Sequence, residues 1–347
     1  MTTYLITGGE GFVGYHLCNE LLKDENNKII IYDALKHFIP LSQSNWCFYQ
    51  NYRVKTLKNS PRLIRIRGEM ISRGFLREVL EEHKPEIIIN LAALPIANIS
   101  NTHSEEAIND VFRSTITLLD VIKNLSYKID RLVHISSSMV YGDFKKDEGG
   151  RILPACEDQQ CSPKGIYGAM KLSAEIMVKT YNLRFKIPFT IIRPSAVYGP
   201  TDCNKRVTEI FVMNTLLGKE LILDNGGLHQ LDFTYVKDLV QGIILASKSP
   251  NALGETFNIT RGEGRTIRDL AELLIRLNPD SGATTIIKEV DVYRPNRGAL
   301  DVSKAKKLLG YNPRYSLEEG MKEYVEFVKK TLFTQKEEFD TTPLYLN

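Results

Sequence analysis

The chain has 347 residues, of which 43% are hydrophobic and 25% are charged. These proportions are typical of a globular protein with a sizeable core, and they exclude a disordered chain, a collagen-like chain and a small disulfide-stapled domain. Lys and Arg number 45 and Asp and Glu 42, so the net charge is only +3. So small a surplus does not predict a nucleic-acid or membrane partner. At about 100–200 residues per domain, the length predicts one large domain or two joined ones.

The five cysteines are an odd number and are spread widely along the chain. Only Cys156 and Cys161 are close together, and their spacing is not that of a zinc site. We therefore expect free thiols and no bound metal. The longest largely apolar stretch, Ile87–Ala97, is too short to cross a bilayer, which takes about 20 residues. The chain begins with a strand-like run rather than a targeting segment, so we expect a cytoplasmic protein.

The first half of the chain alternates short β-branched runs with segments of helical period. The expected strands are Tyr4–Thr7, Lys28–Tyr32, Leu63–Arg67, Ile87–Leu91, Arg131–Ser136 and Phe189–Arg193. The expected helices are Gly14–Lys23, Gly74–His83, Glu105–Leu125 and Ile166–Leu183. Continuous apolar strands suit a parallel sheet that is buried on both faces. The alternation predicts a Rossmann-type α/β fold, a doubly wound parallel sheet, over residues 1–195.

After about residue 195 the elements become shorter and alternate with loops. Helices are expected at Val207–Leu217, Val236–Ser247, Thr266–Leu277, Ser303–Leu309 and Leu317–Phe333, with strand-like runs at Leu221–Leu223 and Thr256–Ile259. Residues 196–333 are therefore predicted to form mainly a smaller C-terminal α/β lobe, and residues 334–347 a mobile tail. A crevice between two such lobes is where ligands usually bind.

The connection at residues 34–62 is unusually long and is rich in aromatic and basic residues. A loop of this length in a compact domain either has a function or contains a helix. We expect a short helical insert that packs its aromatic side chains onto the domain. A lid over a ligand and a contact between subunits are the alternatives.

The first expected strand leads directly into three glycines, Gly8, Gly11 and Gly14, and an amphipathic helix follows. Glycine permits the tight turn and lets a pyrophosphate approach the backbone, and the helix N-terminus favours its negative charge. Asp33 closes the second strand, where a carboxylate can bind a ribose 2′-hydroxyl and would repel a 2′-phosphate. This context predicts a dinucleotide site that favours NAD over NADP.

Two further patterns indicate redox chemistry. Tyr167 and Lys171 are four residues apart, so they share a face of the expected helix at Ile166–Leu183. A nearby ammonium favours phenolate and is expected to lower the pKa of Tyr167 toward working pH, which makes this tyrosine a candidate general base. The run Ser136–Ser138 ends a strand at the carboxyl edge of the sheet, where ligands bind.

Together these motifs resemble the extended short-chain dehydrogenase/reductase family, in its nucleotide-sugar epimerase/dehydratase branch. Further matching segments are Asn90–Ala93, Arg193–Pro200, Asp232–Asp238 and Arg294–Pro313, so the resemblance covers roughly residues 3–330. It implies a Rossmann domain that binds NAD, a C-terminal lobe that binds a nucleotide-diphosphate sugar, and an enzyme of carbohydrate biosynthesis. The helices Glu105–Leu125 and Ile166–Leu183 match those that pair subunits in similar proteins, which implies a homodimer.

The resemblance also implies roles for individual residues. Ser137, Tyr167 and Lys171 would be catalytic, with Ser137 bridging the reacting hydroxyl and Tyr167 acting as the base. The cofactor would be bound by Gly8, Gly11, Phe12, Val13, Gly14, Asp33, Glu69, Met70, Ala92, Ala93, Tyr167, Lys171 and Pro194. The substrate would be bound by Ser138, Arg206 and Arg294. Glu69 stands where similar proteins carry an aspartate that contacts the adenine amino group.

The positions before Val140 distinguish between reactions of this family. Similar 4,6-dehydratases carry an acidic pair there, whereas this chain has Ser138 and Met139. A methionine cannot abstract a proton, so elimination of water is disfavoured. The leading hypothesis is an NAD-dependent nucleotide-sugar epimerase acting at C4 through a 4-keto intermediate. A C4-dehydrogenase or a keto-sugar reductase is the alternative.

Other interpretations have less support. A 4,6-dehydratase lacks its usual acid and base, and a non-catalytic nucleotide-binding regulator would be expected to have lost Tyr167 or Lys171. Two positions on the substrate side depart from the family pattern, because Ala196 stands for an asparagine and Leu231 for an arginine. Arg206 is expected to supply a compensating cation, since an arginine fork suits contact with a diphosphate.

Overall fold

The computed structural model describes residues 1–40, 45–57, 60–289 and 295–334. Its centre is a seven-stranded sheet whose strands are all parallel, in the order β3-β2-β1-β4-β5-β6-β11. These strands are β1 (Thr2–Thr7), β2 (Asn27–Asp33), β3 (Leu63–Arg67), β4 (Ile87–Asn90), β5 (Arg131–Ile135), β6 (Phe189–Arg193) and β11 (Thr256–Asn258). The order reverses beside β1, as in a doubly wound sheet, which confirms the predicted fold class.

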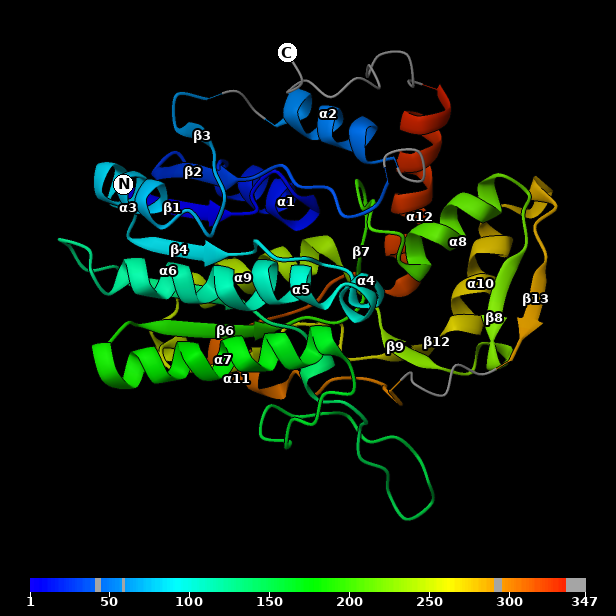
Figure 1. Cartoon of the computed structure of the whole chain (residues 1–347). Helices are drawn as coiled ribbons and strands as arrows, with labels where there is room; N and C mark the ends of the chain where they lie inside the picture. The colour runs from blue at the N-terminus through cyan, green and yellow to red at the C-terminus, as the bar shows by residue number, and fades with distance from the viewer. Residues whose placement is uncertain (41–44, 58–59, 290–294, 335–347) are drawn as a thin grey trace.

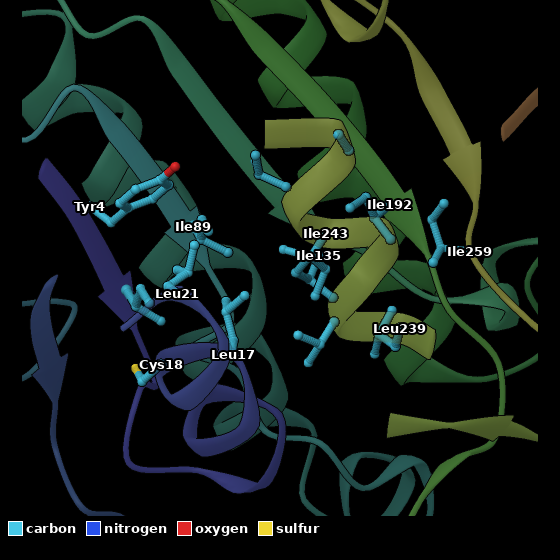
Figure 2. Packing of buried hydrophobic residues seen from close by; sticks show 14 of the residues in the cluster. Tyr4, Leu17, Cys18, Leu21, Ile89, Ile135, Ile192, Leu239, Ile243 and Ile259 are labelled. Atoms are coloured by element: carbon cyan, nitrogen blue, oxygen red, sulfur yellow. The ribbon is translucent and has the colours of Figure 1, made fainter. Parts of the chain in front are cut away.

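Helices cover both faces of this sheet (Figure 1). One face is packed by α1 (Phe12–Leu21), α9 (Val236–Lys248) and α11 (Ser303–Leu309). The other is packed by α3 (Arg73–His83), α6 (Ser114–Ile122) and α7 (Ile166–Phe185). Figure 2 shows Leu17 and Leu21 of α1 and Leu239 and Ile243 of α9 packed among isoleucines of the strands. The apolar side chains on both faces explain the continuous hydrophobic strands of the sequence.

The segment predicted as one helix at Glu105–Leu125 is interrupted by a wider π-type turn. It consists of α5 (Ser104–Ala107), the π-turn η2 (Ile108–Arg113) and α6. The hydroxyls of Ser114 and Thr115 donate to the Asp110 and Val111 carbonyls, both at 2.8 Å. Side-chain hydroxyls of this kind compete for helical carbonyls and bend helices. Preceding α5 is a further helix, α4 (Ala97–Thr102).

In the residues that the structure describes, the second lobe contains three α-helices and two small sheets. Its elements are α8 (Val207–Leu216), β8 (Leu221–Asp224), β9 (Gln230–Asp232), β12 (Gly264–Thr266), α10 (Ile267–Leu277), β13 (Thr285–Lys288) and α12 (Leu317–Val328), the last followed by a π-turn at Lys329–Thr334. Strand β8 pairs with β13 and β9 with β12. Capping boxes begin α10 at Thr266 and α12 at Ser316, which satisfies backbone donors at both helix starts.

The two lobes are not divided cleanly at residue 195. Strand β7 (Val197–Tyr198) pairs with β10 (Thr234–Tyr235), and these short strands lead from the sheet into the second lobe. The chain then returns to the first lobe, because α9 and α11 cover the sheet and β11 extends it beside β6. Short 3-10 turns complete the described elements at Ser138–Val140 (η3), Asn225–Gly227, Pro250–Ala252 and Pro279–Ser281.

The insert at residues 34–62 contains a helix, α2 (Trp46–Thr56). Its aromatic side chains pack mainly on the second lobe, where Phe48 and Tyr49 join the core formed by α8, α10 and α12. The Tyr49 ring stacks on Phe327 with centroids 6.2 Å apart. Figure 1 shows α2 beside α12, above the sheet. The insert therefore connects the two lobes. Within the described ranges, no helix combines the length and the apolar character needed to cross a membrane.

Candidate active site

A large open cavity lies at the carboxyl ends of the central strands, between the two lobes. It holds about 1500 Å³ of empty space, its solvent-exposed mouth included. All of the residues that were predicted to bind the cofactor line this cavity. They are Gly8, Gly11, Phe12, Val13, Gly14, Asp33, Glu69, Met70, Ala92, Ala93, Tyr167, Lys171 and Pro194. The structure thus brings together side chains that are far apart in the sequence.

The glycine turn between β1 and α1 has no room for side chains. A Cβ on Gly14 would lie 2.4 Å from the Gly8 carbonyl oxygen, and a Cβ on Gly8 would lie 2.9 Å from the Ala92 nitrogen. Gly8 also has a φ of +70°, which other residues rarely adopt. Helix α1 begins at Phe12 without a side-chain cap on its first turn. Its free backbone donors therefore fit a pyrophosphate.

Asp33 holds the end of β2 against this turn. One carboxylate oxygen accepts a hydrogen bond from the Glu10 backbone N–H at 3.0 Å, and the other from that of Leu35 at 2.7 Å. Burial raises the pKa of Asp33, and these two hydrogen bonds oppose the rise. Because a carboxylate oxygen has two lone pairs, Asp33 can still accept from a ribose hydroxyl.

Glu69 and Met70 lie beside Asp33, where the adenosine end of a dinucleotide would bind. The Glu69 carboxylate forms an ion pair with the Lys36 ammonium at 2.9 Å, and Lys36 pairs equally closely with Asp110 of η2. All three side chains line the cavity. Lys36 and Asp110 were not among the predicted site residues, because only the fold brings the insert and the π-turn together.

The three predicted catalytic residues meet at the first turn of α7. Gly168 allows this helix to approach η3, since a Cβ there would lie 2.5 Å from the Met139 carbonyl oxygen. The Ser137 side chain acts on the Tyr167 phenol and opposes the rise of its pKa that burial causes. The Lys171 ammonium lies 5.9 Å from the centre of the Tyr167 ring and donates to the Ile135 carbonyl at 2.7 Å. The arrangement puts a phenol, a hydroxyl and an ammonium within reach of one another.

The pKa of Tyr167 differs from the expectation. Burial raises it, and the charge of Arg206 and the hydrogen bond with Ser137 oppose the rise. Thus Arg206, rather than Lys171, is the cation that favours the phenolate in this structure. Burial also lowers the pKa of Lys171 to about 8, an effect that the charge of Glu175 partly offsets. The sequence could not show how deeply the fold buries the side chains of Tyr167 and Lys171.

A buried network lies behind Lys171. Arg193 binds Glu175 through two hydrogen bonds, Nε to Oε1 at 2.9 Å and NH2 to Oε2 at 2.7 Å. Ser136 donates to the same carboxylate at 2.5 Å, and Arg193 also donates to the Tyr141 hydroxyl at 3.0 Å. This network fixes the ends of β5 and β6 and the middle of α7.

The predicted substrate residues have three different outcomes. Arg206 lines the cavity at the start of α8 and pairs with Asp202 at 3.5 Å. Ser138 is 1% exposed and does not line the cavity, although its backbone N–H donates to the Pro194 carbonyl at 2.9 Å. Arg294 lies outside the described residues. Ser137 also does not line the cavity, and it reaches the site through Tyr167.

Several further lining residues were not predicted individually. They are Trp46, Gln50 and Arg53 of α2 and Cys203 and Asn204 of the loop before α8. The aromatic and basic composition of the insert was the available signal, but it did not indicate which residue faces a ligand. Within the described ranges, no cluster of three or more His, Cys, Asp or Glu side chains could hold a metal ion. All five cysteines are free thiols, as expected.

Comparison with known proteins identifies the family. The model of the NAD dependent epimerase/dehydratase family matches residues 4–260. The chain belongs to this family. It is 30% identical over 328 residues to an uncharacterized UDP-glucose epimerase of Bacillus subtilis, covering 93% of this chain and 97% of that protein. It is also 25% identical to a dTDP-glucose 4,6-dehydratase of Haemophilus influenzae, covering 94% and 98% of the two chains.

A solved structure supports the same assignment. The chain is similar to UDP-glucuronic acid 4-epimerase from Bacillus cereus, solved with UDP-glucuronic acid and NAD, with a TM-score of 0.85 and 28% identity over 95% of this chain and 99% of that one. The protein is thus an NAD-dependent enzyme of the extended short-chain dehydrogenase/reductase type, and its relatives include both epimerases and dehydratases. The glycine turn, which leaves no space for a Cβ, fits this cofactor.

Proposed function

We propose that this enzyme is an NAD-dependent nucleotide-sugar epimerase that acts at C4. The observation that carries the proposal is the distribution of carboxyl groups around the cavity. Those among its described lining residues are Glu10, Asp33, Glu69 and Asp110. The first two lie at the glycine turn and the others pair with Lys36, and none of them is among the charges that shift the pKa of Tyr167. Epimerisation needs one base there, whereas elimination of water needs an additional acid and base.

The residues around Tyr167 have distinct roles in this reaction. The Tyr167 oxygen removes the proton of the C4 hydroxyl, and the Ser137 hydroxyl holds the reacting oxygen beside it. NAD, which Gly8, Gly14 and Asp33 would hold, would supply the hydride acceptor and donor that an inversion at C4 needs. Tyr167 then gives its proton back to the C4 oxygen, so the net reaction consumes no redox equivalent.

Two cations near Tyr167 have different roles in the proposed reaction. Burial raises the pKa of Tyr167, and the charge of Arg206 opposes this rise and so favours the phenolate. Lys171 is held by the Ile135 carbonyl and would bind the nicotinamide ribose, while its own pKa of about 8 keeps it mostly charged near pH 7. The Arg206 guanidinium lines the cavity and would also bind the substrate diphosphate.

The experiment is proton NMR of the purified enzyme with NAD and a panel of UDP-, dTDP-, GDP- and CDP-sugars. A second anomeric signal that grows to a fixed ratio without net NADH supports epimerisation. A keto or hydrated-keto signal that accumulates together with NADH contradicts it and indicates a C4-dehydrogenase. Loss of the sugar C6 hydroxyl would instead indicate a dehydratase.

The assignment of Tyr167 is tested by Tyr167→Phe. Loss of a general base is expected to slow epimerisation by about 10²–10⁴-fold while NAD still binds. Tyr181→Phe is the matched control, because Tyr181 is on the same helix and donates to Asp120 away from the cavity. Turnover of Tyr167→Phe at a near-native rate would contradict the assigned role.

We also propose that the enzyme is a homodimer formed through η2, α6 and α7. Large apolar side chains on this face are exposed, with Ile108 at 45%, Ile176 at 54%, Leu183 at 72% and Phe185 at 46%. Such a patch marks a protein interface when it is contiguous. Light scattering should give twice the chain mass of 39.5 kDa, and a mass of one chain would refute the dimer.

A further inference from the structure

Helix α2 of the insert carries a buried arginine at the edge of the cofactor cavity. Arg53 is 1% exposed and lines the cavity. Its guanidinium donates to the Thr201 carbonyl at 3.0 Å and to the Gln50 side-chain oxygen at 2.9 Å, and lies 3.9 Å from the Cys203 sulfur. All of these acceptors are neutral. Its Nε has no hydrogen-bond partner among the described residues.

This environment leaves the buried charge of Arg53 without a carboxylate of the described residues in direct contact. In the described parts of the chain, no carboxylate lies within ion-pair distance of Arg53, whereas the buried Arg193 has Glu175. A buried charge that has no ionic partner in contact destabilises the protein that carries it. A guanidinium that lines a cavity under these conditions is suited to an anionic ligand.

Gln50, one turn before Arg53 on α2, adds a second donor. It is 2% exposed, lines the same cavity, and its side-chain oxygen already accepts from Arg53. Its side-chain N–H₂ has no partner among the described residues. A buried amide donor that is left unpaired is as unusual as an unpaired charge. The two side chains thus offer adjacent donors to one ligand.

The position of α2 indicates which part of a ligand these donors would meet. The Tyr15 hydroxyl of α1 is 2.9 Å from the Thr56 hydroxyl of α2, and the Tyr15 and Tyr52 rings contact edge to face. Helix α2 therefore lies along α1, whose first turn follows the glycine turn. Burial raises the pKa values of Glu10 and Asp33 at that turn, and the Arg53 charge opposes both rises. Arg53 is thus electrostatically coupled to the pyrophosphate end of the dinucleotide site.

We propose that Arg53 and Gln50 bind the diphosphate group of the dinucleotide cofactor. The insert then adds a second positive charge near the glycine turn, where the Glu10 carboxylate already pairs with Arg65 at 2.8 Å. The site also joins the lobes, since the same helix packs Phe48 and Tyr49 into the second-lobe core. A nucleotide-sugar diphosphate has the same chemistry, so the test separates the two ligands.

The test measures binding by calorimetry for wild type, Arg53→Met and Arg53→Lys. The probes are NAD and ADP, which carry the diphosphate, and adenosine, which does not. For Arg53→Met we expect NAD and ADP to bind at least about tenfold more weakly, the loss of one charge-assisted contact, while adenosine affinity changes less than about twofold. Arg53→Lys should recover part of the loss, because it keeps the charge but not the planar fork.

The matched control is Arg131→Met. Arg131 is also a buried arginine that donates to backbone carbonyls, those of Ala246 and Ser249, but it lies outside this cavity. It should leave NAD affinity unchanged. If Arg53→Met does not fold, Gln50→Leu tests the same site, with an expected loss of about threefold or more for NAD and ADP.

Three results would overturn the proposal. One is unchanged NAD and ADP affinity in a folded Arg53→Met. A second is an equal loss for adenosine, which would mean that the substitution disturbs the adenosine site as a whole. The third is a loss confined to UDP, measured with NAD present, which would place Arg53 in the nucleotide-sugar site.

Discussion

Two buried regions on either side of the cavity differ in how their charged side chains are paired. Behind Lys171, the Arg193 guanidinium is fully paired, with both carboxylate oxygens of Glu175 within 2.9 Å. Burial would lower the pKa of Arg193, but the hydrogen bonds and charge of Glu175 raise it overall. The charged groups of this network are therefore paired without any ligand.

The opposite side is formed by α2, the loop before α8 and the first turn of α8, and its buried polar groups are incompletely paired among the described residues. Arg53 has only neutral acceptors, and one carboxylate oxygen of Asp202 and one of Glu209 have no hydrogen-bond partner in the described structure. Burial, followed by the charge of Asp202, raises the pKa of Glu209 to about 8.

This difference indicates where ligands bind. Buried polar groups of stable proteins are nearly always paired, so an unpaired cluster next to a cavity indicates partners that arrive with ligands. The paired network has a structural role, because it holds β5, β6 and α7 in place so that Tyr167 and Lys171 are positioned. The unpaired cluster contributes less to the stability of the ligand-free protein, and a ligand that pairs with it would add more stability.

The largest expected effect comes from breaking the paired network. Arg193→Met leaves the Glu175 carboxylate buried without its partner, and breaking a buried pair in this way costs about 3–5 kcal/mol of the free energy of unfolding. Urea unfolding of the cofactor-free protein measures this loss. Because the network is complete without ligand, saturating NAD should not reduce the difference between variant and wild type.

The same measurement on Arg53→Met provides the contrast. This substitution removes two hydrogen bonds to neutral acceptors and a charge that no described carboxylate contacts, so the cofactor-free protein should lose less than about 3 kcal/mol, the upper value for two hydrogen bonds. Equal losses for Arg193→Met and Arg53→Met would show that the two regions do not differ as the geometry indicates.

The second prediction concerns pH and the unpaired region. Because the pKa of Glu209 in the folded protein is raised to about 8, the folded state favours its protonated form. The stability from this group is complete below its ordinary pKa of 4.5 and is lost as the pH rises through about 8. Glu209→Gln keeps the neutral form at every pH. It should therefore be more stable than wild type at pH 8.5, by on the order of 1 kcal/mol or more.

Thermal or urea unfolding across pH 4.5 to 8.5 tests this prediction, since both pH limits derive from the pKa of Glu209. The two proteins should be similar at the acid end and diverge upward. Glu323→Gln is a control, because Glu323 is exposed on α12 and pairs with Lys237 there. If the stabilities of wild type and Glu209→Gln instead changed in parallel with pH, Glu209 would be charged in the folded protein at neutral pH.

Much of the fold could be predicted because local patterns determine it. The apolar runs Leu63–Arg67 and Phe189–Arg193 are strands β3 and β6 with the predicted bounds. The glycine turn and Tyr167 with Lys171 also meet in one cavity, since short-range spacing defines both motifs. The seventh strand, β11, was expected as a strand but not as part of the main sheet, because strand pairing depends on contacts distant in sequence.

The unpredicted parts of the site depend on tertiary contacts. Helix α2 was expected from its length, but its packing follows from Phe48 and Tyr49 fitting the second-lobe core. The low pKa of Lys171 and the raised pKa of Tyr167 follow from burial, which a spacing of four residues does not report. That Arg53 lacks a carboxylate partner is likewise visible only in the folded chain.

The smallest effect is expected where ionic contacts are exposed. Lys36 forms two ion pairs, with Glu69 and with Asp110, each at 2.9 Å. Arg193 likewise forms two hydrogen bonds to the carboxylate of Glu175. Its side chain is 38% exposed, however, and that of Glu69 is 47% exposed. Water screens such pairs, so Lys36→Met should cost less than about 1 kcal/mol. The difference from wild type should shrink further at high salt, which urea unfolding at two salt concentrations would measure. A loss as large as that of Arg193→Met would mean that the number of ionic contacts, and not their burial, sets the difference between the regions.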